Sequence, residues 1–331
     1  MDSLTQIVLG AAVGEVVLGR KVGNKAMIYG AIAGTIPDLD VFVGNAYDTV
    51  TALEIHRGFS HSLVFSILTG PLIGFVLSKL HKSASWKDWS LLMFWGLFTH
   101  PILDCFTTWG TQLFWPFDLR IAFKTIFVIE PLYTLPFLIC LLIASRYQRT
   151  ARKRKKWNHL GIILSSFYLL ITIVMKGITY TKFEAALQRA GISYSELETK
   201  PSPFNSILWT ANVKTKDAFL IGDYSILDTQ PINFRRFPKN HNKIQDLNAY
   251  DNLRRLVNIT NGWYTITQQG DKLYFNDLRF GLLSLGPKAD TFAFSYLLEE
   301  KEDRLVITEQ PKTRGDAQQL LSELWIRLKG N

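Results

Sequence analysis

The sequence has few cysteines: only Cys105 and Cys140 among 331 residues, and both lie inside apolar stretches. This scarcity excludes a disulfide-stabilised fold and a cysteine-ligated zinc site. The chain also lacks an evenly spread basic surface, because seven of its Lys and Arg residues fall between Arg146 and Lys156. Basic loops between apolar segments are typical of membrane proteins, so the net charge of +9 does not indicate a nucleic-acid partner.

Long apolar runs occur only in the first part of the chain. Residues 1–180 are expected to form a polytopic α-helical membrane bundle, and residues 181–331 a soluble α+β domain. A bilayer core of about 30 Å requires about 20 apolar residues in a helix, which predicts some five to six membrane-spanning helices. The six candidate segments are residues 4–20, 26–43, 61–80, 89–108, 126–145 and 159–179.

Lys and Arg residues gather in alternate loops between these segments, namely 20–25, 79–87 and 146–156. The intervening loops contain only Arg57, Arg120 and Lys124. Because cytoplasmic loops are enriched in Lys and Arg, the pattern predicts that the N-terminus and the C-terminal domain lie outside the cytoplasm. Glycines four residues apart within the segments, such as Gly10 and Gly14, predict closely packed helices.

Beyond residue 180 the pattern changes to that of a soluble domain. A short helix is expected at 183–190 and an amphipathic closing helix at 317–328. Strand-like runs lie between them at residues 207–213, 218–226, 263–268, 272–275, 291–298 and 305–308.

Acidic and histidine residues gather at the ends of four apolar segments. In chain order they are Asp38, Asp40, His56, His61, His100, Asp104 and Glu130. The predicted orientation brings all of them to the outer side of the membrane, where ionisable groups by default indicate function. His100 and Asp104 are four residues apart, so on a helix they share a face and can bind one ion together.

The first six of these residues offer three imidazoles and three carboxylates, a ligand set that favours Zn²⁺, with Mn²⁺ or another divalent ion as an alternative. Six ligands exceed the need of one catalytic zinc, so the number of ions stays open. Arg57 is either a clamp for a phosphate or carboxylate group, or a salt-bridge partner of Glu54 or of an Asp ligand. Glu130 is expected in a catalytic or supporting role, and Glu15, deeper in the first segment, in a buried hydrogen bond.

The motifs resemble those of the YdjM-type inner-membrane proteins. The resemblance covers about residues 1–145 and rests on Pro-Asp-Leu-Asp at 37–40, His-Arg-Gly-Phe-Ser-His-Ser at 56–62, and the stretch from His100 to Asp104 followed by Thr107, Gly110 and Trp115-Pro116. It implies that Asp38, Asp40, His56, His61, His100 and Asp104 bind metal. Such proteins often have a histidine near the N-terminus, where this chain has Gln6.

Members of that family are described as membrane-bound metal-dependent hydrolases and are grouped with zinc phospholipase C and P1 nuclease. The resemblance therefore implies an inner-membrane hydrolase. Arg57 and Glu130 are the candidate catalytic residues because of their charge and their predicted place on the outer side of the membrane. A site at headgroup depth, like the grouping with phospholipase C, favours a membrane lipid or another amphiphilic phosphoester as substrate. An ion transporter or channel, and a metal-stabilised membrane scaffold without catalysis, remain alternatives. The sequence does not indicate the oligomeric state.

Overall fold

The structure is a computed structural model that describes residues 1–285, 290–311 and 317–331. The chain divides into two compact units. The first consists of Met1–Ala46, Ile55–Ile173 and Pro203–Asn205, and the second of Tyr47–Glu54, Val174–Ser202 and Ser206–Asn331. The second unit thus begins near the predicted boundary at residue 180 but also includes a short segment from the early part of the chain.

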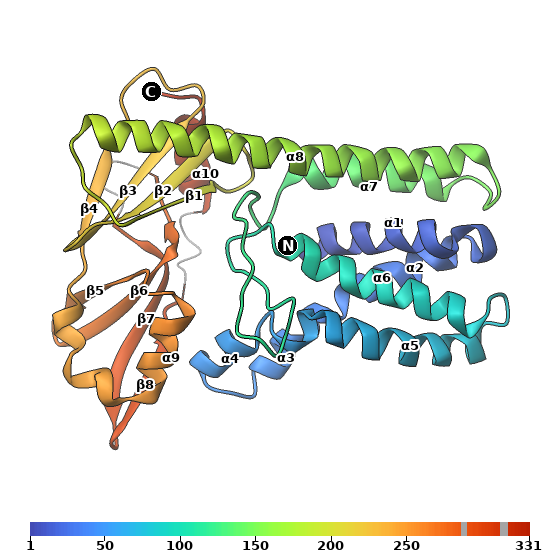
Figure 1. Cartoon of the computed structure of the whole chain (residues 1–331), viewed down its shortest axis with the longest axis horizontal. Helices are drawn as coiled ribbons and strands as arrows, with labels where there is room; N and C mark the ends of the chain where they lie inside the picture. Colours follow the sequence, from blue (N-terminus) through green and yellow to red (C-terminus); the bar gives the residue numbers. More distant parts are fainter. Residues whose placement is uncertain (286–289, 312–316) are drawn as a thin grey trace. The chain divides into compact units, whose positions relative to one another are not determined.

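Helices form the first unit (Figure 1). In chain order they are α1 (Ser3–Val22), α2 (Asn24–Thr35), the 3₁₀ turn η1 (Pro37–Leu39), α3 (Asp40–Gly44), the 3₁₀ turn η2 (Phe59–His61), α5 (Leu63–Leu80), α6 (Trp86–Asp104) and α7 (Pro131–Ser145). The 38-residue helix α8 (Arg152–Arg189) begins in this unit and continues into the second. The helix α4 (Thr49–Ile55) falls almost entirely in the second unit.

Fewer helices can span a membrane than the hydropathy pattern predicts. Among the described residues, α1, α5 and α8 are long and apolar enough, and α2 with η1 and α3 would make a fourth, bent span. Helix α7 has 15 residues and is only about 22 Å long. Helix α6 includes Lys87, Asp88, His100 and Asp104, which lower its apolar character, and much of it is buried. The expectation of five to six spans is therefore not supported, and the count is three to four.

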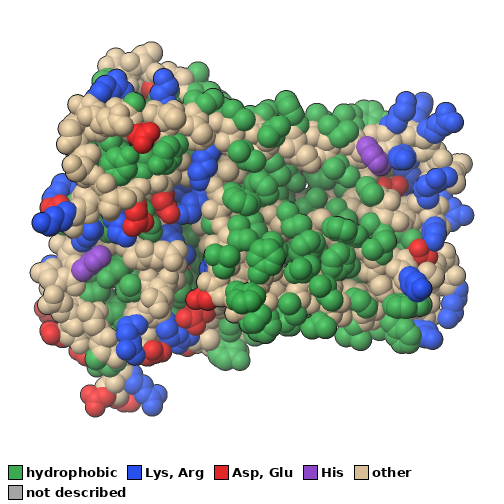
Figure 2. Space-filling model, in the orientation of Figure 1, with side chains coloured by type: hydrophobic (Ala, Val, Ile, Leu, Met, Phe, Trp, Pro, Cys, Tyr) green, Lys and Arg blue, Asp and Glu red, His purple; other side chains and the backbone are tan. Residues whose placement is uncertain are grey.

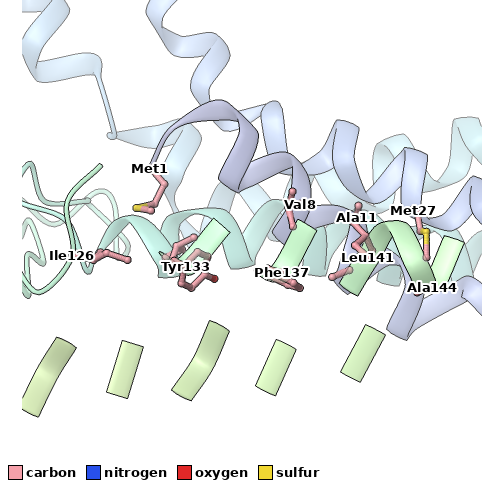
Figure 3. Close-up of a cluster of buried hydrophobic side chains, with 11 residues drawn as sticks. Met1, Val8, Ala11, Met27, Ile126, Tyr133, Phe137, Leu141 and Ala144 are labelled. Atoms are coloured by element: carbon pink, nitrogen blue, oxygen red, sulfur yellow. The ribbon is translucent and has the colours of Figure 1, made fainter. Parts of the chain in front are cut away.

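Small residues allow the helices to approach closely, as the glycine spacing predicts. A Cβ atom on Gly10 would lie 2.3 Å from the carbonyl oxygen of Gly30, so α1 and α2 are in backbone contact. A Cβ atom on Gly74 of α5 would likewise overlap the backbone of α6 at Ser90. Figure 3 shows a second type of contact, in which larger side chains of α7 such as Phe137 pack beside residues of α1 such as Val8.

The three basic loops lie together at one end of the helices. Lys21 after α1 forms an ion pair of 2.7 Å with Asp88 at the start of α6. Its carbonyl oxygen accepts a hydrogen bond from Arg149, in the loop between α7 and α8. Figure 2 shows Lys and Arg side chains gathered at this end, next to a surface that is mostly hydrophobic. Such a distribution agrees with a membrane-embedded unit, and its orientation in the membrane stays a prediction.

The second unit contains two four-stranded antiparallel sheets. The first comprises β1 (Glu196–Pro201), β2 (Leu208–Lys214), β3 (Ala218–Ser225) and β4 (Phe234–Pro238), and the second β5 (Tyr264–Gln269), β6 (Lys272–Leu282), β7 (Phe292–Lys301) and β8 (Arg304–Glu309). Phe183 and Leu187 of α8 pack on the first sheet against Trp209. The unit also contains α9 (Asp251–Ile259) and α10 (Ala317–Leu328).

The predicted α+β character of this part is confirmed. The six expected strands correspond to β2, β3, β5, β6, β7 and β8, and the closing helix to α10. The expected separate helix at 183–190 is instead the end of α8. Strands β1 and β4 and helix α9 were not predicted.

Candidate metal centre

Four ionisable side chains meet at the ends of the helices away from the basic loops: Asp38, His61, His100 and Asp104. Asp38 lies on η1 just after α2, and His61 ends η2 just before α5. His100 and Asp104 occupy the last turns of α6. One ligand atom from each lies within 4.8 Å of the others. The Asp38 side chain is 26% exposed and the other three are fully buried. We call these four residues the metal cluster.

The distances within the metal cluster are short and similar. The Nε2 atoms of His61 and His100 are 3.2 Å apart. Asp38 Oδ1 lies 3.3 and 3.4 Å from these two nitrogens, and Asp104 Oδ2 lies 3.6 Å from both. A tetrahedral ion with bonds of about 2.0–2.2 Å separates its ligand atoms by about 3.3–3.6 Å. The four side chains therefore fit one divalent ion.

Hydrogen bonds leave both Nε2 atoms available as ligands. His100 Nδ1 lies 2.6 Å from the carbonyl oxygen of Gly34, which can only accept, so the ring proton is on Nδ1. His61 Nδ1 lies 3.3 Å from Asp40 Oδ2, and a carboxylate favours the same tautomer. Lone pairs of two nitrogens and two carboxylate oxygens then face one another in a buried space. A proton could satisfy one of these contacts, whereas a divalent cation attracts all four atoms.

Asp40 and His56 lie beside the metal cluster rather than in it. Asp40 Oδ1 is 3.1 Å from His56 Nδ1, and Asp40 Oδ2 accepts hydrogen bonds from Ser60 Oγ and from the backbone N–H of Arg57. Both carboxylate oxygens are thus engaged, one of them close to His61. The structure brings together four of the six expected metal-binding residues, and Asp40 is placed to orient His61.

Arg57 contacts the metal cluster from the side of Asp104. Its Nε lies 3.1 Å from Asp104 Oδ2, and its Nη1 donates a hydrogen bond of 2.6 Å to Thr107 Oγ1. The side chain is almost fully buried. Of the two salt bridges considered for Arg57, the structure has the one with an Asp of the predicted ligand set, while Glu54 pairs with Arg255 of α9. Its catalytic role stays a prediction.

The backbone at Arg57 adopts the left-handed conformation, with φ of 59°. This conformation is unfavourable for residues other than glycine and persists only where neighbouring contacts hold it. The Arg57 N–H donates to Asp40 Oδ2, and its carbonyl oxygen accepts a hydrogen bond from the N–H of Gln112. The segment between His56 and His61 is therefore fixed from both sides.

Gln6 occupies the position where the resemblance expects a histidine. Its Nε2 donates a hydrogen bond of 2.9 Å to Asp104 Oδ1, to which the backbone nitrogen of Met1 also donates. These contacts hold one oxygen of Asp104 and leave Oδ2 facing His61 and His100. From the sequence, Gln6 is only a departure from the motif. The hydrogen bond by which its amide holds Asp104 was not predicted.

Glu15 and Glu130, the two glutamates to which the sequence assigns a role, lie outside the metal cluster. Glu15 forms a buried two-pronged ion pair with Arg154 of α8, with N–O distances of 2.5 and 2.6 Å, in agreement with its expected buried hydrogen bonds. Glu130 is buried directly before α7 and is not one of the four converging residues.

Comparisons with known proteins show the family of the chain. The family model described as "YdjM inner membrane protein" matches residues 1–179, slightly more than half of the chain. The chain belongs to the YdjM inner membrane protein family. It is also similar to the inner membrane protein YbcI of Escherichia coli (strain K12), with 34% identity over 102 residues, which are 30% of this chain and 57% of YbcI. No solved structure matches the chain.

The YdjM match includes the whole metal cluster and Arg57 but ends before the two sheets. The family and the relative both indicate an inner-membrane location. Neither match links the chain to zinc phospholipase C or P1 nuclease, and the chain spans a little over half the length of YbcI.

Proposed function

We propose that this YdjM-family protein is a membrane-bound metal-dependent hydrolase that uses zinc and cleaves a phosphoester. The proposal depends on one observation: two imidazole nitrogens and two carboxylate oxygens converge in a buried group, with a guanidinium against one carboxylate. A mixed nitrogen and oxygen set with these spacings suits Zn²⁺, and Mn²⁺ is the alternative. Mg²⁺ and Ca²⁺ prefer oxygen ligands.

The surrounding residues have distinct tasks in this proposal. A divalent ion held by the cluster would supply Lewis acidity and, with a fifth position open to solvent, a water of lowered pKa. Arg57 keeps its positive charge and stabilises negative charge that develops on the phosphoryl oxygens. Asp38 is the one partly exposed member of the cluster, so substrate reaches the site from its side. Asp40 and Gln6 orient His61 and Asp104.

Glu130 receives no step here, because it is not one of the four converging residues, and its catalytic role stays a prediction. We also propose that the cluster and the C-terminal unit lie outside the cytoplasm. The support is the alternation of basic loops, which lie at the opposite end of the helices from the cluster.

The test compares metal content with phosphate release. Detergent-purified wild-type protein with zinc is offered phosphomonoesters, phosphodiesters and phospholipids. His61→Ala should lose both the metal and turnover, whereas Arg57→Lys should keep the metal and lose most turnover. Arg255→Lys, outside the cluster, serves as the matched control. Wild-type protein that binds zinc but cleaves none of these compounds would contradict the proposal.

A metal-stabilised scaffold is the second candidate. A tetrahedral ion bound by four protein side chains has no free position, which is typical of structural zinc sites. Bound metal without turnover, together with loss of thermal stability on chelation, would support the scaffold. A transporter would need ionisable groups deep in the membrane that can bind an ion in transit. Glu15, the one deep carboxylate predicted from the sequence, pairs with Arg154 and does not support this hypothesis.

A further inference from the structure

Large apolar side chains are exposed on the segments next to the metal ligands, namely η1, α3 and η2, and on the loop of residues 105–125. Phe42 and Phe117 are each 72% exposed, Leu39 is 51% exposed, Phe59 43% and Trp115 37%. We call these five residues the aromatic rim. Exposed apolar groups of this size, gathered around one site, indicate contact with lipid, a ligand or another protein.

The aromatic rim begins immediately beside the metal ligands. Phe59 and His61 lie on the same 3₁₀ turn, yet Phe59 faces outward and His61 is fully buried. Leu39 follows Asp38, the one partly exposed ligand. The two turns that carry these residues, η1 and η2, lie against each other. Entry to the metal cluster at Asp38 is therefore flanked by apolar surface.

Ring contacts connect the rim to the outer surface of α5. The rings of Phe59 and Trp115 are 4.9 Å apart, and those of Phe59 and Phe65 are 5.4 Å apart. Phe65 belongs to α5, a candidate span whose apolar window is only 22% buried within the protein. Ile67 and Leu68, two and three residues further along α5, are exposed. The rim thus continues the exposed apolar surface of α5, a candidate span.

The polar groups next to the rim residues of the 105–125 loop are engaged within the protein. Gln112 donates a hydrogen bond of 2.9 Å to Asp118, and Arg120 donates to the carbonyl oxygen of His56. The five residues between Gln112 and Asp118 are Leu-Phe-Trp-Pro-Phe and include no charge. An apolar tip that contains Trp and has charges beside it suits the boundary between headgroups and acyl chains.

We propose that the aromatic rim is embedded in the lipid bilayer and that the metal cluster opens sideways to the lipid. The substrate is then a membrane-resident amphiphile whose chains lie along the rim while its phosphate enters beside Asp38 and reaches the metal cluster. The assignment of a substrate depends on the proposed hydrolase function. The embedding of the rim does not, because it follows from exposure and from continuity with α5.

Spin labels in reconstituted vesicles test the embedding directly. The two native cysteines are only 3% and 4% exposed, so wild-type protein measures the labelling background. Labels are placed in Phe42→Cys and Phe117→Cys, and in Asp271→Cys, which is exposed in the turn between β5 and β6, as the water-facing control. Oxygen dissolves in the lipid, whereas a water-soluble nickel chelate stays in the aqueous phase. Oxygen should therefore relax the labels at 42 and 117 more than the nickel chelate does. At 271 the nickel chelate should relax the label more than oxygen does. If the nickel chelate relaxed the labels at 42 and 117 as much as the label at 271, the rim would face water and the proposal would be wrong. The same result is expected if the rim binds another protein instead of lipid.

Turnover tests the substrate class. The double variant Phe42→Asn/Phe117→Asn should lower the ratio of long-chain to short-chain phosphoester cleavage about tenfold or more, because buried contacts with the chains are lost. Asp271→Asn should leave the ratio unchanged. An unchanged ratio in the double variant would refute lateral entry. If wild-type protein cleaves neither substrate, the hydrolase function and its substrate are refuted, and the spin labels still decide whether the rim is embedded.

Discussion

Exchanging Asp38 and Asp40 in turn for asparagine distinguishes a metal ligand from a residue that orients one. Both changes keep side-chain size and remove one negative charge. Asp38 Oδ1 lies 3.3 and 3.4 Å from the two imidazole Nε2 atoms, so Asp38→Asn removes an anionic ligand. Asp40 instead contacts Nδ1 of His61, the nitrogen remote from the cluster, at 3.3 Å. Removing such a supporting carboxylate typically lowers metal affinity about 10- to 100-fold, or about 1.4–2.7 kcal/mol.

The affinities are measured by competition with a fluorescent zinc chelator in detergent. Asp40→Asn should still bind one ion at saturating zinc with affinity reduced by the amount above, and Asp38→Asn should lose more. Asp271→Asn, in the exposed hairpin turn, should bind as wild type does. If Asp40→Asn bound zinc more weakly than Asp38→Asn, Asp40 would be a direct ligand and the four-atom arrangement would be wrong.

Three further predictions concern stability, measured by unfolding in detergent. Glu15→Gln should destabilise the helices by about 3–5 kcal/mol because it leaves the buried Arg154 unpaired, and Glu15→Gln/Arg154→Met should recover part of the loss. Gly10→Ala should cost about 1–3 kcal/mol because its Cβ would overlap the backbone of α2, whereas Gly177→Ala, with no atom within 4 Å, should not. Burial lowers the pKa of His241 below 6.5, so the unfolded chain binds the proton more readily than the folded chain does. The free energy of unfolding should therefore fall as the pH drops from 7 to 5. His241→Phe should reduce this dependence on pH. If wild type and His241→Phe showed the same dependence of unfolding free energy on pH, the His241 prediction would be wrong. If Gly10→Ala and Gly177→Ala were equally stable, the prediction for Gly10 would be wrong.

The convergence of the metal cluster was predictable because it follows from the ends of helices. Hydropathy locates those ends. In consecutive antiparallel helices, the C-terminal end of one helix lies beside the N-terminal end of the next. The spacing of His100 and Asp104 also places both on one face of α6. The sequence does not distinguish Asp38 from Asp40. Asp38 lies on the 3₁₀ turn η1 and Asp40 begins α3, and only the packing of the neighbouring segment decides which carboxylate faces the histidines.

Other elements were missed for identifiable reasons. Strands β1 and β4 lie at the edges of the first sheet, and their polar or proline-containing sequences show no hydrophobic alternation. Helices α6 and α7 were taken as spans because hydropathy alone does not distinguish a membrane helix from one that packs among other helices.

The metal content of the purified protein tests the central claim most directly. Wild-type protein and the double variant His61→Ala/His100→Ala are dialysed against the same mixture of divalent ions and measured by elemental analysis, with circular dichroism to show that both are folded. We expect one ion per wild-type chain and none in the folded double variant. Equal metal content in the two proteins would contradict a site built from these side chains.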